Sequence, residues 1–392
     1  MGHMPEMLER GRQTLATLLS NGGYQTAYLG KWHLGLSWQT KNDEEPMDDG
    51  TNVDYTQPFS GGPLDHGFDY YHGIAASLDM PPYVFLKNDR AVKVPDVYWD
   101  RFRTFRQPGL KTADWQDEAF NTIVTEQATK LIGEYGKNLD PWFIYVALAA
   151  PHTPHRPSER VKGKSEAGAR GDMVLEVDWT VGEVMEALKR SGQYNNTLLI
   201  ITSDNGAITN GMPKWAGNPA WYEVQDYGHA ANGYFRGQKG DVYEGGHRVP
   251  MVMHWPDKIR KPGTIDHIVS LTDLFSTFAT LVDQPVRDAT DSYDLSAYFV
   301  HDTVKSPVRK SVTHYAYHYD LYAFRTDTLK YVNGLGSGGF MGAYMEEDSV
   351  RSGVQLYNMA MDPTEQTNIA QGNPALLGKL DSALKADLVK VK

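Results

Sequence analysis

Four short polar segments of the chain place lysine, histidine, aspartate and asparagine next to glycine or proline. They are GKWH (30–33), PHTPH (151–155), SDNG (203–206) and RGQKG (236–240). Lysine and histidine donate hydrogen bonds and supply positive charge, whereas the side-chain oxygens of aspartate and asparagine suit a hard cation such as calcium. Brought together, these groups could bind a tetrahedral oxyanion and give a proton to an ester leaving group.

Each segment alone also has an ordinary structural explanation. Lys31 could be a solvated lysine in a turn, and His152 could be a hydrogen-bonded loop histidine between two prolines. The sequence Asp204-Asn205-Gly206 could be only a turn, since all three residue types favour turns. A catalytic or binding site is the better interpretation only if the fold brings the four segments together.

Three of the segments directly follow apolar stretches that predict buried strands, at 24–29, 142–149 and 197–202. Apolar residues with helical spacing at 118–136 and 173–188 alternate with these strands. Such alternation is typical of an α/β fold with a covered sheet. Because ligands bind beyond the carboxyl ends of strands in open α/β sheets, we expect the polar segments to line a site there.

The chain is expected to form two domains. Residues 5–20 predict a first helix, and residues 267–271 predict a further strand. A charged, proline-containing stretch near 301–310 predicts a domain boundary. We therefore assign residues 1–305 to a large α/β domain and residues 306–392 to a small C-terminal domain with an antiparallel sheet and a helix.

Composition excludes several classes of protein. The chain has 392 residues, 38 Lys and Arg against 49 Asp and Glu, and a net charge of −11, which argues against a nucleic-acid or membrane-surface binder. It has no cysteine, so disulfides, thiolate metal sites and cysteine nucleophiles are excluded. No apolar run approaches the ~18 residues of a membrane-spanning helix. We recognise no signal peptide in the printed chain and assign no compartment.

The segment GYQTAYLGKWHLG (23–35) resembles a signature of the type I sulfatases, in the alkaline-phosphatase-like superfamily. The resemblance implies a mixed sheet flanked by helices and hydrolysis of aryl or carbohydrate sulfate esters. Further segments match the family in the same order: HGFDYYHGIAASLDMPPY (66–83), APHTPHRP (150–157), TLLIITSDNGA (197–207), FRGQKGDVYEGGHRVPMVMHWP (235–256), IVSLTDLFSTFATLV (268–282) and LYNMAMDPTEQTNIA (356–370).

The resemblance also implies catalytic roles for four matching residues. Lys31 would contact the sulfate and the nucleophile, and His33 would hydrogen-bond the nucleophile and help to resolve a covalent intermediate. His152 and Lys239 would bind sulfate at the bridging ester oxygen and protonate the leaving group. This division suits the chemistry, because charge develops on the leaving oxygen as the ester bond breaks.

Metal and substrate contacts follow from the same resemblance. Asp204 and Asn205 would bind Ca²⁺, and His229 and Arg236 match, more loosely, a segment that often lines the substrate pocket. Calcium takes about 6–8 oxygen ligands. Since two residues supply too few, we expect weak calcium binding by this chain alone.

One part of the family pattern is absent from this sequence. The family normally begins with a strand that has two adjacent aspartates, followed by a C/S-x-P-x-R motif whose Cys or Ser is oxidised to formylglycine, the nucleophile. This chain has no Cys and no Ser-x-Pro, so no formylglycine is expected at such a site. We expect the first strands of the large domain to be missing. Open sheet edges would then favour a homodimer or a higher oligomer.

Three functions therefore remain open. The first is a hydrolase of aryl or carbohydrate sulfates, with weak or phosphoester-promiscuous activity because the usual nucleophile is absent. The second is a pseudoenzyme that binds sulfated ligands without turnover. The third is an incomplete gene product with no evolved role.

Overall fold

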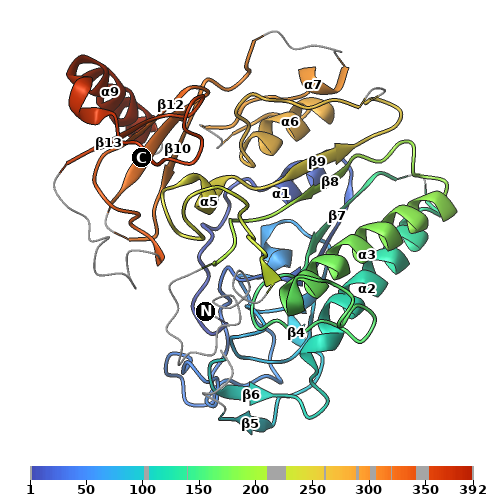
Figure 1. Cartoon of the computed structure of the whole chain (residues 1–392). Coiled ribbons are helices and arrows are strands. Elements are labelled where there is room, and N and C mark those ends of the chain that lie inside the picture. The colour runs from blue at the N-terminus through green and yellow to red at the C-terminus, as the bar shows by residue number, and fades with distance from the viewer. Residues whose placement is uncertain are drawn as a thin grey trace. The chain divides into compact units, whose positions relative to one another are not determined.

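The computed structural model shows two compact units (Figure 1). The first unit consists mainly of residues 1–195, and the second unit consists of most of residues 196–392. The described residues are 2–100, 106–138, 140–209, 227–259, 262–287, 291–300, 306–318, 320–340 and 353–390.

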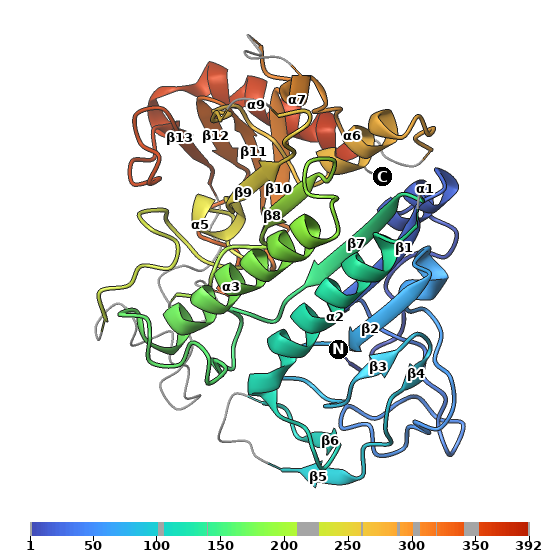
Figure 2. The ribbon, with the colours of Figure 1, turned by 90° about the vertical axis from the view of Figure 1, so that its right-hand side faces the viewer.

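A five-stranded mixed sheet organises the first unit, in the order β4-β3-β2-β1-β7 (Figure 2). Its centre is parallel: β1 (Gln25–Lys31) lies between β2 (Tyr70–Ile74) and β7 (Trp142–Ala147). Two short strands, β3 (Leu86–Lys87) and β4 (Arg90–Ala91), extend the sheet on the β2 side with antiparallel pairing. The apolar stretches around 24–29 and 142–149 therefore form strands, as predicted.

Side chains of β1 alternate between two hydrophobic cores, as the pleat requires. Ala27 and Leu29 face a core that includes Phe120 and Val124 of a helix, α2 (Phe120–Tyr135). Tyr28 faces a second core formed largely by loop residues between 32 and 68. Since both faces of β1 are covered, its central residues Ala27, Tyr28 and Leu29 are buried in succession rather than alternately.

The other helices of the first unit frame this sheet. The longest, α3 (Gly168–Arg190), packs beside α2 (Figure 2). The short helix α1 (Leu15–Asn21) begins where Thr14 Oγ1 accepts a hydrogen bond from the Thr17 amide at 3.1 Å. The remaining elements are η1 (Pro63–His66), η3 (Asp117–Ala119) and a ribbon of β5 (Val97–Trp99) with β6 (Gly109–Lys111).

The second unit contains a two-stranded ribbon and a four-stranded sheet. The ribbon pairs β8 (Leu199–Thr202) with β9 (Met251–His254). The antiparallel sheet has the order β10-β11-β12-β13. Its strands and the accompanying helices are β10 (Ser311–Tyr315), β11 (Tyr322–Thr326), β12 (Leu329–Val332), β13 (Gln355–Asn358), α5 (Glu244–His247), α6 (Asp273–Leu281), α7 (Ala297–Val300), η6 (Ala370–Gly372) and α9 (Pro374–Lys390).

Helix α9 covers one face of this antiparallel sheet. Leu380 and Leu384 of the helix join Phe324, Tyr331 and Leu356 of the strands in one hydrophobic cluster. The α/β class is thus confirmed, as is an antiparallel sheet with a helix near the C-terminus. The predicted boundary after residue 305 lies in the second unit, and residues 301–305 themselves lie outside the described residues. In the described part of the chain, no helix has the length and apolar character needed to cross a membrane.

Two predicted elements differ from the structure. Residues 267–271 are irregular rather than a strand, and the Ser270 amide donates to Asp273 Oδ2 at 2.8 Å, where α6 begins. Residues 5–14 are not helical, since the Met7 amide donates to the Leu34 carbonyl at 2.9 Å. In both places a hydrogen bond to a later residue takes the backbone amide that the expected helix or strand would have used.

Candidate functional site

The GKWH segment leaves the sheet at the carboxyl end of β1. Gly30 has φ +104°, and a Cβ there would lie 2.0 Å from the Ala147 carbonyl oxygen, so only glycine fits between β1 and β7. The amide of Trp32 donates to the Ile74 carbonyl and that of His33 to the Ala75 carbonyl, each at 3.0 Å. These bonds fix the backbone that presents Lys31 and His33.

His33 adopts a backbone conformation that is uncommon outside glycine, with φ +59°. Residues in this region cost about 1–3 kcal/mol and persist where surrounding contacts hold them. Here the neighbouring Trp32 is 5% exposed and packs edge-on to the Tyr28 ring at 5.2 Å. The Tyr28 hydroxyl in turn donates to the Lys31 carbonyl. This packing holds the turn after β1 in one conformation.

The second histidine segment follows β7, the neighbour of β1. The amides of Ala149 and Ala150 both donate to Asn121 Oδ1, at 3.0 and 3.3 Å, and the His152 amide donates to the Ala149 carbonyl at 2.8 Å. His152 Nδ1 lies 2.6 Å from the Thr153 carbonyl oxygen. Because a carbonyl can only accept, Nδ1 bears the proton, and Nε2 of the neutral ring is left as the atom that can gain and give a proton.

The structure brings three of the predicted residues to one sheet edge. Gly30 of β1 is in register with Ala147 of β7, and the two strands run parallel. Lys31 is the last residue of β1, and His33 and His152 follow β1 and β7, so the three residues lie at the carboxyl ends of adjacent strands, where ligands of α/β proteins bind. His155 is a poor proton acceptor by comparison. Burial, together with the nearby Arg170 and His152, lowers its pKa to about 3.

The second unit places the SDNG and RGQKG segments side by side. The Lys239 amide donates to the Ala207 carbonyl at 3.1 Å, and the Gly206 amide donates to the Gly246 carbonyl at 3.0 Å. Asn232 joins the two segments further, since its Nδ2 donates to the carbonyls of Ala207 and Gly237. Asp204, Asn205 and Lys239 consequently lie on adjoining loops of one unit.

Comparison with known proteins identifies the family. The profile of the family described as Sulfatase matches residues 2–284, well over half of the chain. The chain belongs to the sulfatase family. It is a type I sulfatase of the alkaline-phosphatase-like fold, as the segments quoted above predict.

Three relatives illustrate the similarity. An N-acetylgalactosamine-6-O-sulfatase of Bacteroides thetaiotaomicron is 27% identical over 98% of this chain and 78% of its own length. The mouse N-acetylgalactosamine-6-sulfatase is 28% identical over 75% of this chain, which spans about half (49%) of that relative. A solved structure from work on glycosaminoglycan metabolism by Bacteroides thetaiotaomicron has 26% identity and a TM-score of 0.83, covering 100% of this chain and 84% of its own.

The calcium ligands expected in this sulfatase do not form a complete set in the described residues. Asp204 Oδ1 accepts the Asn205 amide at 3.0 Å, and Asn205 Nδ2 donates to the Gly206 carbonyl at 3.0 Å. Within the described ranges, no group of three or more histidine or acidic side chains could hold a metal ion. Asp204 and Asn205 alone do not fit calcium, which takes about 6–8 oxygen ligands.

Arg236 of the sulfatase has a set of contacts that the sequence did not indicate. Its guanidinium lies 4.0 Å from the Tyr243 ring centroid and donates to the Tyr357 hydroxyl at 3.2 Å and the Glu365 carbonyl at 2.8 Å. These contacts tie the loop of Lys239 to the segment after β13. His229, the other looser candidate, is half-buried, and residues 210–226 before it lie outside the described residues.

Sequence reasoning missed a buried ionic cluster next to this loop. Lys330 of β12 lies 2.7 Å from Glu365 Oε1 and 3.3 Å from Glu244 Oε1. Burial raises the pKa of Glu365, and Lys330 opposes that rise. For Glu244 burial also acts to raise the pKa, but Lys330 and Arg325 outweigh it and the pKa is lowered. In the sequence, the signal for this cluster was a single lysine, Lys330, inside the short strand segment 329–332.

Proposed function

We propose that this chain hydrolyses sulfate esters of carbohydrates, with N-acetylgalactosamine 6-sulfate units as the first substrates to test. The observation that supports the proposal most is the placement of Lys31, His33 and His152 at the carboxyl ends of the paired strands β1 and β7. The names of the bacterial and mouse relatives support the substrate class. Calcium binding and a homodimer or higher oligomer stay predictions.

The chemistry assigned to the chain is hydrolytic. Lys31 binds the nonbridging sulfate oxygens through its positive charge. Water adds its oxygen to sulfur, the bond between sulfur and the bridging oxygen breaks, and His152 in its protonated form gives the Nε2 proton to the departing sugar oxygen. Of the two protons that the water loses, one returns His152 to its protonated form and the other passes to solvent. The products are the free hydroxyl and sulfate. The family resemblance implies a role in sulfate binding for Lys239 as well, and mutation tests that role.

Mutation of the proposed residues tests this function. Sulfate release from a saccharide with N-acetylgalactosamine 6-sulfate is measured for the wild type and for Lys31→Ala, His152→Ala and Lys239→Ala. We expect each variant to lose about 10²–10⁴-fold in kcat/KM. Lys87→Ala is the matched control, because Lys87 is an exposed lysine of the same sheet. Equal background release in the wild type and all variants would rule the hydrolase out.

A second candidate is a protein that binds sulfated saccharides through the same Lys31 and His152 without turnover. Binding of the same saccharide by calorimetry separates the two candidates. Binding that Lys31→Ala abolishes, with no sulfate released by the wild type, would favour the pseudoenzyme.

A further inference from the structure

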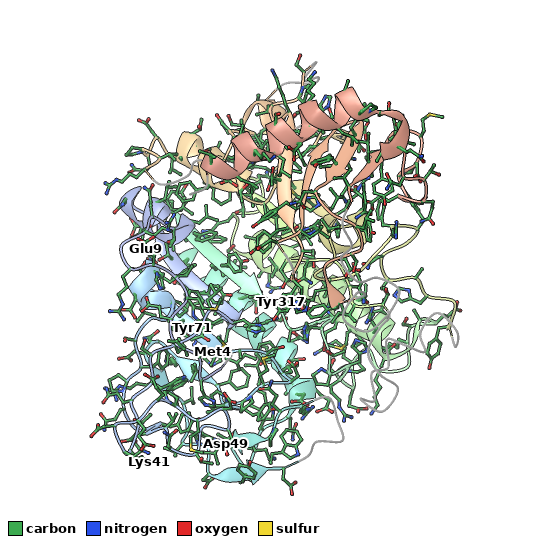
Figure 3. All side chains as sticks on the ribbon, turned by 90° about the vertical axis from the view of Figure 1, so that its left-hand side faces the viewer. Met4, Glu9, Lys41, Asp49, Tyr71 and Tyr317 are labelled. Atoms are coloured by element: carbon green, nitrogen blue, oxygen red, sulfur yellow. The ribbon has the colours of Figure 1, made fainter. Side chains whose placement is uncertain are left out.

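Three rings of the second unit gather beside the loop of Lys239. Tyr317, which Figure 3 labels, lies in the connection between β10 and β11. Its ring centroid is 5.0 Å from that of Phe340 with an interplanar angle of 31°, and 4.5 Å from that of His318 with an angle of 85°. Tyr317 is 59% exposed, and Phe340 and His318 beside it are half-buried.

Backbone contacts fix these rings on Gly240, the residue after Lys239. The Tyr317 amide donates to the Gly240 carbonyl at 2.8 Å, and the His318 amide donates to the Gly338 carbonyl at 2.7 Å. Gly240 has φ +84°, and a Cβ there would lie 3.1 Å from Phe340 Cδ2 and 3.2 Å from Tyr317 Cβ. The missing side chain of Gly240 thus lets the rings lie directly on the loop.

The hydrophobic core does not account for the position of Tyr317. The neighbouring core cluster contains Ala316 and Leu321, on either side of Tyr317 in sequence, together with Val242 and Tyr243, but it does not include Tyr317. An aromatic ring left at the surface gains little of the free energy that burial would provide. An exposed aromatic ring that backbone contacts hold in place is available to pack on the apolar face of a ligand.

We propose that Tyr317 and Phe340 form a stacking platform for the pyranose ring of the sulfated saccharide, with the sulfate directed to Lys239. The axial C–H groups of a galactose-type ring make an apolar face, which packs on an aromatic ring and exposes its hydroxyls to solvent. The inference rests on the proposed function for the identity of the ligand. It adds the residues that recognise the sugar rather than the sulfate.

The test separates recognition of the sugar from recognition of the sulfate. Steady-state kinetics and calorimetry use a saccharide with N-acetylgalactosamine 6-sulfate, and inorganic sulfate serves as a competitive inhibitor. For Tyr317→Ala we expect KM, or the Kd by calorimetry, to rise about tenfold. We expect kcat and the inhibition constant of sulfate to change less than twofold. Tyr317→Phe retains the ring and should restore the wild-type KM.

Tyr315→Ala is the matched control for this experiment. Tyr315 is 68% exposed in the same unit, but its ring lies 6.3 Å from that of Tyr322 rather than on Gly240. If the wild type binds the saccharide without cleaving it and Tyr317→Ala weakens that binding, the result supports the stacking platform and contradicts the hydrolase function. If the wild type cleaves the saccharide and Tyr317→Ala behaves like Tyr315→Ala, the platform is wrong. A wild type that neither binds nor cleaves the saccharide also overturns it.

Discussion

The ammonium of Lys330 lies 2.7 Å from the carboxylate of Glu365, and neither side chain is exposed to solvent. Glu365 also accepts the Glu244 amide at 2.7 Å through Oε2, and its backbone carbonyl accepts Arg236. One buried residue after β13 thus holds both ends of the loop that contains Lys239. The loop between Arg236 and Glu244 is therefore held in place by contacts with residues of the antiparallel sheet and the segment after it.

Loss of the lysine should destabilise the fold strongly. Lys330→Met leaves the carboxylates of Glu244 and Glu365 buried without their main cation, and removal of one partner of a buried pair costs about 3–5 kcal/mol. The free energy of unfolding from urea denaturation measures this loss. In the double variant Lys330→Met/Glu365→Gln we expect part of it to be recovered, because one of the unpaired charges is removed.

A surface pair provides the control for Lys330. Lys385 lies 2.6 Å from Asp381 on α9, and its side chain is 73% exposed. Exposed pairs contribute about 0–1 kcal/mol, so Lys385→Met should change the free energy of unfolding by less than that. An effect of Lys330→Met no larger than that of Lys385→Met would contradict a stabilising role for the cluster.

Asn121 is predicted to position His152. Its Oδ1 accepts the amides of Ala149 and Ala150, and its Nδ2 donates to Glu176 Oε2 at 3.1 Å, all in a buried region. For Asn121→Ala we expect unfolding free energy to fall by about 1–3 kcal/mol. We also expect kcat for the sulfated saccharide to fall at least tenfold with little change in KM, because the proton donor moves while the sulfate contacts remain.

Thr129→Ala is the control for Asn121 on the same helix. Thr129 Oγ1 donates only to the Glu126 carbonyl at the exposed surface, so neither kcat nor stability should change appreciably. Asn121→Ala could be less stable and still show the wild-type kcat at a temperature where it is folded. That result would mean that Asn121 has only a structural role.

The strands that present the candidate site could be predicted from sequence, but the contacts that hold them could not. The central residues of β1 are apolar because they pack into two hydrophobic cores, and β7 is a continuous apolar run, so the signal for both strands is local. The pair of Lys330 and Glu365 is separated by 35 positions, and a lysine in a strand is ordinarily exposed. Likewise, the contact of Tyr317 with Gly240 joins segments that no local pattern connects.

Calcium binding is predicted to be weak. Asp204 and Asn205 offer few oxygens, and a low number of ligands gives affinities on the order of millimolar rather than micromolar. Titration calorimetry on the purified chain measures the dissociation constant, with Asp204→Ala as the comparison. A micromolar dissociation constant that Asp204→Ala abolishes would show that further ligands complete the site.

The paired histidines His247 and His314 are predicted to make the fold sensitive to acid. Their ring centroids are 3.9 Å apart, and His314 Nε2 donates to the Val242 carbonyl at 3.1 Å. Burial lowers the pKa of His247 to about 4, with Lys330 nearby adding to the effect and Glu244 opposing it. Burial, His247 and Lys330 also lower the pKa of His314 well below its ordinary value.

The direction of the pH effect follows from where the protons bind. Between pH 6.5, the ordinary pKa of histidine, and about 4, the unfolded chain binds protons that folded His247 and His314 do not. Stability is therefore complete above pH 6.5 and falls as pH decreases, by up to about 1.4 kcal/mol per pH unit for each histidine. Urea denaturation from pH 7 to pH 4.5 measures this slope.

A double variant identifies the histidines responsible for the slope. His247→Gln/His314→Gln removes both titrating groups. The loss of unfolding free energy between pH 6.5 and 4.5 should therefore become smaller, by up to the combined contribution of the two histidines. Burial also lowers the pKa of His72, on the sheet of the first unit, to about 4, so His72→Gln is the comparison for a single buried histidine elsewhere. If the double variant keeps the full wild-type slope, the paired rings are not the acid-sensitive element, because their protonation would then be the same in folded and unfolded chains.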